Sequence, residues 1–428
     1  MFRECRDEDS GHARPRPGFQ AAWAVRAIMV GLLALVVLGA AGSGCVWRRV
    51  EMVPPLEGEP VVVGIPLPLS GAKAAFGEAK RNAYQLAADQ VNAEGGLDGR
   101  PLALVFRDTA GDPATAAEVG EELIAEGATL LIGEFSSGCA LALAAVAQRL
   151  SVPYLVDSAA ADAITQQKSP YVFRLNPPAG LLAQGLESFL TGVVHPRSLA
   201  IVYERSDYGS SCARAMREWC RRNGVTVPVF EAYEPGALDF GPLLERVGQA
   251  SPDVLYMVSY LVDASLLVRQ ARAKALSVRL LAGAGGGFVL PEFVESAGQA
   301  AENVVSAAVW APTLGYPGAA VFAETYRARF GRYPGHHAAE AYAAIEVVAD
   351  ALRRAASTEP DRVREALAAT ELMTVLGPVR FENFEKYRNQ NRLQTVVLQV
   401  RNGAYEVIWP PEAATAEPLF PDPLAGGD

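Results

Sequence analysis

Strand-like apolar runs alternate with amphipathic helical segments along most of this 428-residue chain, and that alternation limits its fold more than any other feature. The first run is Val61 to Ile65, and apolar residues then recur at helical spacing between Ala79 and Val91. Repeated strand and helix units predict an α/β fold with parallel sheets covered by helices. With 50% hydrophobic and 20% charged residues, the chain is long enough for two or three globular domains.

Two sets of strands are expected, separated by the segment Asn176-Pro177-Pro178. Strands of the first set are expected at 61–65, 102–106, 129–132 and 152–156, and those of the second at 198–203, 225–231, 253–258, 278–282 and 304–309. Helices are expected near the end of the chain at 318–330, 338–355 and 361–369. Asn402-Gly403 lies between two strand-like runs, 393–400 and 404–409, and predicts a hairpin with a type I′ turn.

Two loops rich in small residues follow consecutive buried strands, at 133–138 and 157–160. In a parallel sheet these loops lie side by side at the carboxyl ends of the strands, where open α/β sheets bind their ligands. Ser136 and Ser137 open a helix, so hydroxyls, backbone N–H groups and the positive helix end converge, which suits a carboxylate. A serine at a helix start also serves as an N-cap alone, and that interpretation stays open.

The composition argues against several classes of function. The formal net charge is -10, and no basic run after residue 60 is long enough to follow phosphates, so we expect no nucleic-acid partner. Of the four histidines, His336 and His337 are adjacent, and adjacent side chains point apart on a helix or strand. We therefore expect no metal site and no cofactor, and the lack of a G-x-S-x-G elbow further favours a binding protein over an enzyme.

The N-terminus is typical of an exported protein. An apolar run from Ala27 to Ala41 follows several arginines and precedes Gly42-Ser43-Gly44-Cys45, which predicts a signal peptide at 1–44. The run has about 15 residues and is short for a transmembrane helix. Small residues directly before Cys45 resemble a bacterial lipobox and predict that Cys45 is lipidated, which would anchor the chain to a membrane of the cell envelope. A cleaved signal peptide with an incidental Cys45 is the other interpretation.

Four separated blocks carry a resemblance to a known family. They are Gly64 to Asp108 with Asp98-Gly99-Arg100, Gly133 to Arg174, Asp207-Tyr208-Gly209 with Arg269 to Arg272, and Gly377 to Phe381 with the closing hairpin. In this order and spacing, residues 60 to 410 resemble the type I periplasmic solute-binding proteins of the leucine/isoleucine/valine-binding class, which serve ABC importers.

The resemblance implies two Rossmann-like lobes with parallel sheets, a three-strand hinge and a ligand cleft between the lobes. After a linker at 45–58, it places lobe 1 at 59–178 and 310–378 and lobe 2 at 179–309 and 379–410. Residues 411–428 are rich in proline, alanine and glycine and are expected to form a disordered tail. The mechanism of the family is hinge closure over a trapped solute.

The resemblance also implies a set of ligand-binding residues. The loop of Ser136 and Ser137 and the turn Ser158-Ala159-Ala160 are expected to receive a carboxylate. Aromatic walls are expected from Phe76, Tyr208 and Tyr260, although either tyrosine serves equally well as a core residue. The glycine run 283–287, with Gly286, is interpreted as a loop of the cleft that allows close approach.

Two departures from the family leave the solute open. Ala160 stands where amino-acid binders commonly have threonine, and the glycine run replaces the acid that pairs with the α-ammonium group. A buried ammonium without a partner costs on the order of several kcal/mol. Either Asp157 or Asp263 replaces that acid, or the ligand is not an α-amino acid.

The sequence therefore predicts an extracytoplasmic, monomeric substrate-binding lipoprotein of an ABC importer. Its solute is expected to be small and to carry a carboxylate, as in a branched-chain or other amino acid or a related acid or amide, and its partner is an inner-membrane permease. The alternatives are a ligand-sensing receptor module of a signalling or regulatory system and an envelope protein whose cleft binds nothing.

Overall fold

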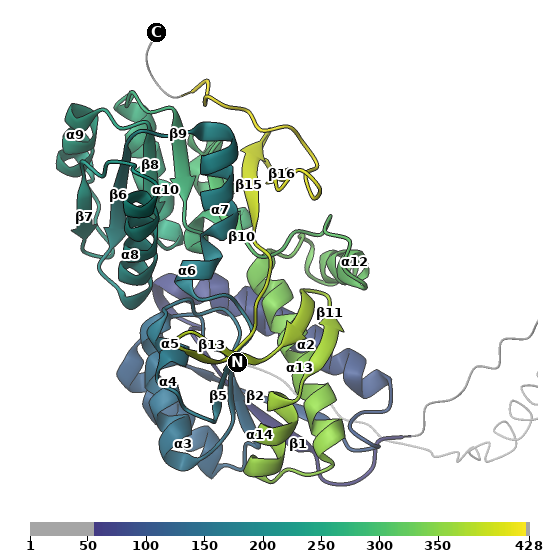
Figure 1. Ribbon diagram of the computed structural model, residues 1–428. Helices are drawn as coiled ribbons and strands as arrows, with labels where there is room; N and C mark the ends of the chain where they lie inside the picture. Colours follow the sequence, from purple (N-terminus) through teal and green to yellow (C-terminus); the bar gives the residue numbers. More distant parts are fainter. Residues whose placement is uncertain (1–54, 425–428) are drawn as a thin grey trace, which may run out of the picture. The chain divides into compact units, whose positions relative to one another are not determined.

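Two seven-stranded sheets covered by helices, and one two-stranded sheet of β11 (Glu371–Thr374) and β12 (Gly377–Arg380), lie within residues 55–424, the part of the chain that the computed structural model describes (Figure 1). The predicted signal peptide and Cys45 lie outside these residues. The strand order of the first sheet is β13-β14-β5-β4-β3-β1-β2. Its strands are β1 (Val61–Leu67), β2 (Leu102–Asp108), β3 (Leu130–Ile132), β4 (Tyr154–Val156), β5 (Val172–Arg174), β13 (Glu382–Phe384) and β14 (Tyr387–Gln390).

The first sheet is parallel from β2 to β5, and its central strands are apolar and buried. Strands β3 and β4 pair in parallel, as the sequence predicted, and every residue of both is buried. Strands with both faces covered by helices require such continuous apolar runs. The helices of this lobe, which we call lobe 1, are α2 (Ala74–Ala93), α3 (Pro113–Ala125), α4 (Ser137–Leu150), α5 (Ala163–Gln166), α13 (His336–Ala355) and α14 (Pro360–Ala368).

The second sheet defines lobe 2 and has the strand order β16-β15-β10-β9-β8-β6-β7. Its strands are β6 (Leu199–Glu204), β7 (Phe230–Tyr233), β8 (Val254–Val258), β9 (Leu280–Gly283), β10 (Val305–Ala308), β15 (Val396–Arg401) and β16 (Ala404–Trp409). Its helices are α6 (Ala179–Leu182), α7 (Gln184–Phe189), α8 (Asp207–Arg222), α9 (Gly241–Ala250), α10 (Leu261–Ala273) and α11 (Pro291–Ala297).

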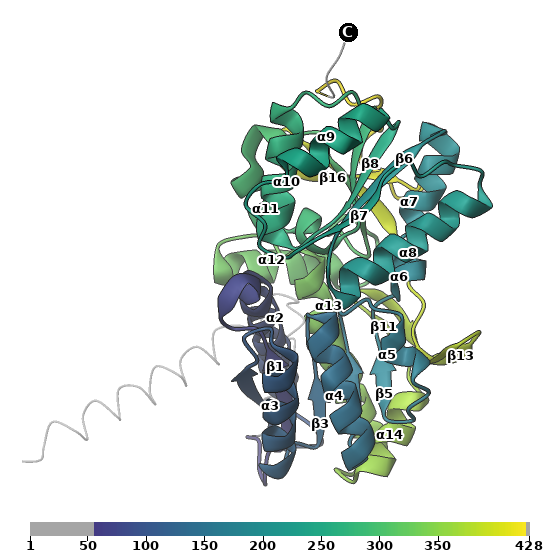
Figure 2. The same ribbon diagram turned by 90° about the vertical axis from the view of Figure 1, so that its left-hand side faces the viewer.

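Alternate side chains of the second sheet enter two different cores. Ile201 and Tyr256 pack with residues of α7 and α8, whereas Val202 and Leu255 pack with residues of α9, α10 and α11. Figure 2 shows these two groups of helices on opposite faces of the sheet. The period of two along each strand therefore divides the helices between the faces.

The chain passes between the lobes three times, after β5, after β10 and after β14. The elements not yet placed are η1 (Gly71–Lys73), η2 (Leu190–Val194), η3 (Gly286–Val289), η4 (Gly298–Ala301) and α12 (Ala319–Phe330). Within residues 55–424, none of the helices combines the length and the apolar character that crossing a bilayer demands.

The two-lobed α/β fold is confirmed, but three details of the prediction are wrong. Strand β7 begins at Phe230 rather than near residue 225, because Pro228 cannot donate a ladder hydrogen bond. Only an isolated bridge, Ser198 to Thr226, precedes β7 among the described residues. The second detail concerns the boundary between the lobes and the third concerns the C-terminal segment.

Residues 382–390 belong to lobe 1 and not, as predicted, to lobe 2. Strand β14 pairs in parallel with β5, with Gln390 opposite Arg174, and the Arg174 Nε donates to Gln390 Oε1 at 2.6 Å. Because Arg174 is fully buried, this bond satisfies a charge that has no access to water. The chain therefore returns to lobe 2 through residues 391–395, later than predicted.

The segment 411–424 is ordered against lobe 2, which corrects the prediction of a disordered tail at 411–428. Asp422 is buried and forms an ion pair with Arg272 at 2.6 Å, and Leu419 N donates to Gln399 Oε1 at 3.0 Å. These few specific bonds fix a segment whose composition gives no periodic signal. The prediction of disorder, which rested on the composition of this segment alone, is therefore wrong for residues 411–424.

Candidate functional site

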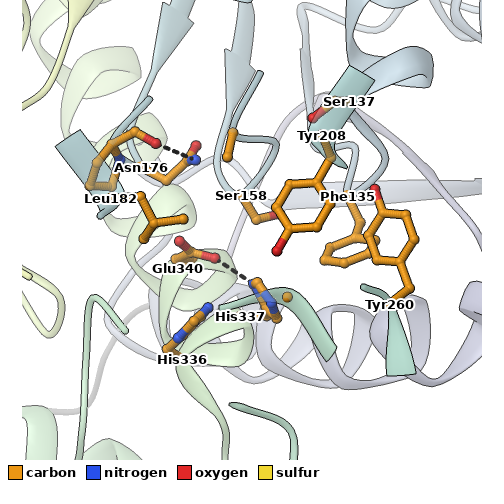
Figure 3. A pocket seen from close by; sticks show the side chains of 13 residues that line it. Phe135, Ser137, Ser158, Asn176, Leu182, Tyr208, Tyr260, His336, His337 and Glu340 are labelled. Carbon is orange, nitrogen blue, oxygen red and sulfur yellow. Dashed lines mark hydrogen bonds and ion pairs between the residues drawn. The ribbon is translucent and has the colours of Figure 1, made fainter. Parts of the chain in front are cut away.

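A small cavity between the two lobes collects the loops at the carboxyl ends of the strands (Figure 3). Its volume is about 20 Å³, which is close to the space that one water molecule needs. Its lining consists of Phe135, Ser137, Ser158, Ala160, Asn176, Pro177, Leu182, Tyr208, Tyr260, Gly286, His336, His337 and Glu340. The cavity is therefore too small for a solute larger than water.

The loop after β3 is held by a buried carboxylate. Glu134 accepts hydrogen bonds from Thr109 Oγ1 at 2.7 Å and from the backbone N–H of Ser136, and burial raises the pKa of Glu134 above its usual value. Ser137 Oγ accepts from the backbone N–H of Ala161 at 3.1 Å, which ties this loop to the loop after β4. The hydroxyl hydrogen of Ser137, at the start of α4, is thereby left to donate into the cleft.

A buried ion pair supports the loop after β4. Lys80 of α2 lies with its Nζ 2.5 Å from Asp157 Oδ1 and 2.6 Å from Ser158 Oγ, and Lys80 and Asp157 are both fully buried. Tyr84 donates to the other oxygen of Asp157, and burial together with the Asp157 charge raises the pKa of Tyr84 well above its usual value. The carboxylate of Asp157 is therefore fully used within the protein beneath the cleft.

Removing the cation of this pair is expected to destabilise lobe 1 strongly. In Lys80→Met, Asp157 is left as a buried charge with no cation, and we expect the free energy of unfolding to fall by about 3–5 kcal/mol. Urea unfolding followed by circular dichroism measures this change. The double variant Lys80→Met, Asp157→Asn is expected to recover most of it, and equal instability of the single and double variants would contradict the ion-pair account.

Aromatic rings from both lobes close one side of the cavity. Tyr208 and Tyr260 of lobe 2 stack with their ring centroids 5.2 Å apart, and Phe135 of lobe 1 lies 5.2 Å from Tyr260. Phe76 stacks behind Phe135 at 3.8 Å and does not border the cavity itself. Phe135, rather than the expected Phe76, therefore supplies the aromatic side chain of lobe 1 that borders the cavity. Its position directly before Ser136 in the loop was the sequence signal that could have indicated this.

The glycine run allows the backbone of lobe 2 to approach this wall closely. A Cβ atom at Gly286, whose φ is +53°, would lie 2.5 Å from Tyr208 Oη. At Gly287 it would lie 2.5 Å from the carbonyl carbon of Tyr260. Neither contact is sterically allowed, so these positions require glycine.

Alanine at position 286 tests the close approach. Gly286→Ala is expected to displace Tyr208 and to lower the free energy of unfolding by about 2–4 kcal/mol, as the sum of backbone strain and overpacking. The control is Gly298→Ala, because Gly298 has φ +58° but its added Cβ would meet no atom within 4 Å among the described residues. Thermal unfolding that gives the same loss for both variants would show that contact with Tyr208 is not the cause.

The N-terminal turn of α13 supplies the acidic and basic groups of the cavity. His337 Nδ1 lies 2.8 Å from Glu340 Oε2, and the rings of His336 and His337 have their centroids 4.1 Å apart. Burial lowers the pKa of each histidine to about 3 and raises the pKa of Glu340 to about 8. At neutral pH both imidazoles are therefore uncharged, and Glu340 is largely protonated in the closed cleft.

This cluster corrects the expectation that the adjacent histidines point apart. At the first two positions of a helix no preceding turn blocks the side chains, so both rings reach the same side. One ligand atom from each of His336, His337 and Glu340 lies within 4.8 Å of the others. The spacing of His337 and Glu340, three residues apart on one helix face, was the sequence signal for the pair.

The predicted ligand residues fall into two groups. Ser137, Ser158, Ala160, Tyr208, Tyr260 and Gly286 border the cavity, whereas Phe76, Ser136 and Ala159 are buried and do not border it. Asp157 and Asp263, the two candidates for pairing an ammonium group, do not border it. Asp263 instead accepts from the backbone N–H of Gly236 at 2.9 Å. His336, His337, Glu340 and Asn176 border the cavity and were not predicted.

Comparison with known proteins agrees with this architecture. Residues 60–404 match the sequence profile of the periplasmic binding protein family, and the chain belongs to that family. It is similar to the Leu/Ile/Val-binding protein homolog 7 of Brucella suis, with 27% identity over 377 residues that cover 84% of this chain and 94% of the relative.

Solved structures show the same fold. The branched-chain amino acid transporter substrate binding protein LivJ from Streptococcus pneumoniae, in complex with isoleucine, superposes with a TM-score of 0.74 at 25% identity, over 82% of this chain and 100% of that one. A solute binding protein of an ABC transporter from R. palustris, in complex with benzoate, gives a TM-score of 0.73 at 21% identity, over 83% and 99% of the two chains.

Proposed function

We propose that this protein is the substrate-binding component of an ABC importer and captures a small carboxylate-bearing solute by closure of its two lobes. The observation that carries the proposal is the cavity itself, which is bordered by strand-end loops of both lobes and is too small for a solute unless the lobes separate. A solute that contacts both lobes stabilises the closed state and shifts the population toward it. The neighbours that bind isoleucine and benzoate support a solute of this size and charge.

The carboxylate subsite lies at the loops after β3 and β4. Ser137 opens α4, so the first-turn N–H groups and the helix dipole favour an anion there. The hydroxyl of Ser137 remains able to donate, since the bond from Ala161 uses its oxygen as acceptor. Ser158 and Ala160 of the loop after β4 also border the cavity and offer backbone groups, while the Ser158 hydroxyl accepts from Lys80 and donates to Asp157 at 3.3 Å.

Loss of the Ser137 hydroxyl is expected to weaken binding. Titration calorimetry with amino acids, and with carboxylic acids that lack an amino group, first identifies a solute. The binding free energy of that solute should then be weaker by about 1.5–3 kcal/mol in Ser137→Ala, which is the contribution of a hydrogen bond to a charged group. Ser296→Ala, an exposed serine on α11, is the control. Unchanged affinity in Ser137→Ala would remove Ser137 from the subsite, and no binding of any acid would reject the proposed function.

The N-terminal segment supports an extracytoplasmic, membrane-anchored protein that docks as a monomer on a permease of the inner membrane. In this proposal Cys45 becomes the lipidated first residue after removal of the signal peptide. The ligand-sensing alternative uses the same cleft and differs in the partner.

The anchor is tested by Cys45→Ser, which is expected to move the protein from the membrane fraction to the soluble fraction of the cell envelope. Immunoblotting of the separated fractions measures the distribution, with Cys139→Ser, a buried cysteine of α4, as the control. If the Cys45→Ser protein stays with the membranes, the apolar segment rather than a lipid holds it there.

A further inference from the structure

Several polar atoms that border the cavity on the α13 side have no hydrogen-bond partner among the described residues. Asn176 Oδ1 and His337 Nε2 are buried and find no hydrogen-bond partner among residues 55–424, and the same holds for His336 Nδ1. Glu340 adds a carboxyl group whose bond to His337 engages one of its two oxygens. Buried polar atoms without partners are rare in folded proteins and call for an explanation.

The orientation of Asn176 follows from its neighbours. Its Nδ2 donates to the carbonyl oxygens of Ala159 at 3.2 Å and of Pro177 at 3.1 Å, so both amide hydrogens are used and Oδ1 is the atom left over. Figure 3 shows a hydrogen bond made by the side chain of Asn176 and the bond between His337 and Glu340, with Leu182 between them. An oxygen of this kind can only accept a hydrogen bond.

In the part of the chain that the structure describes, no lysine or arginine side chain donates a hydrogen bond to these partnerless atoms. Neither lysine nor arginine is among the residues that border the cavity. Lys80, the buried lysine beneath it, is neutralised by Asp157 and donates to Ser158. Lys73 donates to Ser136 Oγ at 3.2 Å, on the side of the cleft where Ser137 lies.

We propose that Glu340 and His337 form the subsite for the solute's ammonium group, so that the solute is an amino acid rather than an acid without an amino group; the free oxygen of Asn176 borders the same cavity. An ammonium group has three N–H donors and no acceptor, which suits a carboxylate and an imidazole nitrogen. The inference rests on the proposed function, which supplies the opposite subsite for the carboxylate. It replaces Asp157 and Asp263 as candidates, because neither borders the cavity.

A change of protonation accompanies binding in this arrangement. The charged and titratable groups near Glu340 are His336 and His337 of its own helix, Lys80 of α2 and Asp157 of the loop after β4. Burial, with Asp157, raises the pKa of Glu340, while His336 and Lys80 lower it, and the net value is about 8. An adjacent ammonium favours the ionised carboxylate, so Glu340 releases its proton when the solute binds. His337 then donates from Nδ1 to Glu340 and accepts from the solute at Nε2.

The test compares amino acids with their counterparts that lack the amino group. Calorimetry with each of the twenty amino acids, and with 4-methylpentanoate and benzoate, is carried out on the wild type, on Glu340→Gln and on His337→Gln. We expect at least one amino acid to bind the wild type, and its affinity to fall about 10- to 100-fold in Glu340→Gln. Affinity for any acid that lacks the amino group should change less than about threefold.

Glu346→Gln is the matched control. Glu346 lies on the same helix, and burial raises its pKa to about 7, but it accepts from Val375 N and does not border the cavity. We expect this variant to bind as the wild type does. A second readout is the binding enthalpy at pH 7 in phosphate and in Tris, whose difference should report release of most of one proton in the wild type and none in Glu340→Gln.

Several outcomes would overturn the inference. If benzoate or 4-methylpentanoate binds and no amino acid does, the cleft takes an acid without an ammonium group and the proposed function stands. If an amino acid binds equally to wild type and Glu340→Gln, its ammonium lies elsewhere. If ZnCl₂ alone binds and Glu340→Gln and His337→Gln abolish that binding without affecting amino acids, the cluster is a metal site. Binding of none of these probes would reject the proposed function with it.

Discussion

The buried ion pair between Lys80 and Asp157 sets the geometry of the cleft. It joins α2 to the loop after β4 across 77 positions of sequence, and it also holds the hydroxyl of Ser158. Two fully buried charges are tolerated only in good geometry with further hydrogen bonds, which Tyr84 and Ser158 supply. The pair therefore fixes the position of the loop after β4, and it removes Asp157 from contact with a solute. Recognition of positive charge is left to the groups on α13.

Aromatic side chains of the two lobes meet across the cleft. Phe135 and Phe76 of lobe 1 meet Tyr260 of lobe 2 with ring centroids 5.2 and 6.0 Å apart. Such aromatic pairs contribute about 0.5–1.5 kcal/mol each beyond the area they bury. In the proposed function, a solute that adds charged hydrogen bonds to both sides shifts the equilibrium toward the closed state.

Local sequence patterns predicted the α/β elements, and the family resemblance added the two lobes and about half of the residues that border the cavity. The strand runs, the serine at the start of α4 and the glycines 283–287 each follow from the residues beside them, since turn chemistry and helix starts are local. Lys80, His337, Glu340 and Asn176 could not be found in this way. Each acquires its role from a partner or a cavity formed by distant parts of the chain. The sequence pattern around Lys80, for example, gives no sign that its side chain pairs with Asp157.

Two failures share a physical cause. Strand β14 and the segment 411–424 lack a strong apolar pattern, and both are held by buried polar pairs, Arg174 with Gln390 and Arg272 with Asp422. Specific polar bonds of this kind fix a segment without any hydrophobic periodicity, so sequence patterns miss them.

The central claim is that a solute closes the two lobes on each other, and small-angle X-ray scattering of the purified protein tests it most directly. The account predicts a larger radius of gyration without solute, and a decrease on saturation with the amino acid that calorimetry identifies, toward the value calculated from the closed structure. Scattering curves that coincide with and without a bound amino acid would contradict it.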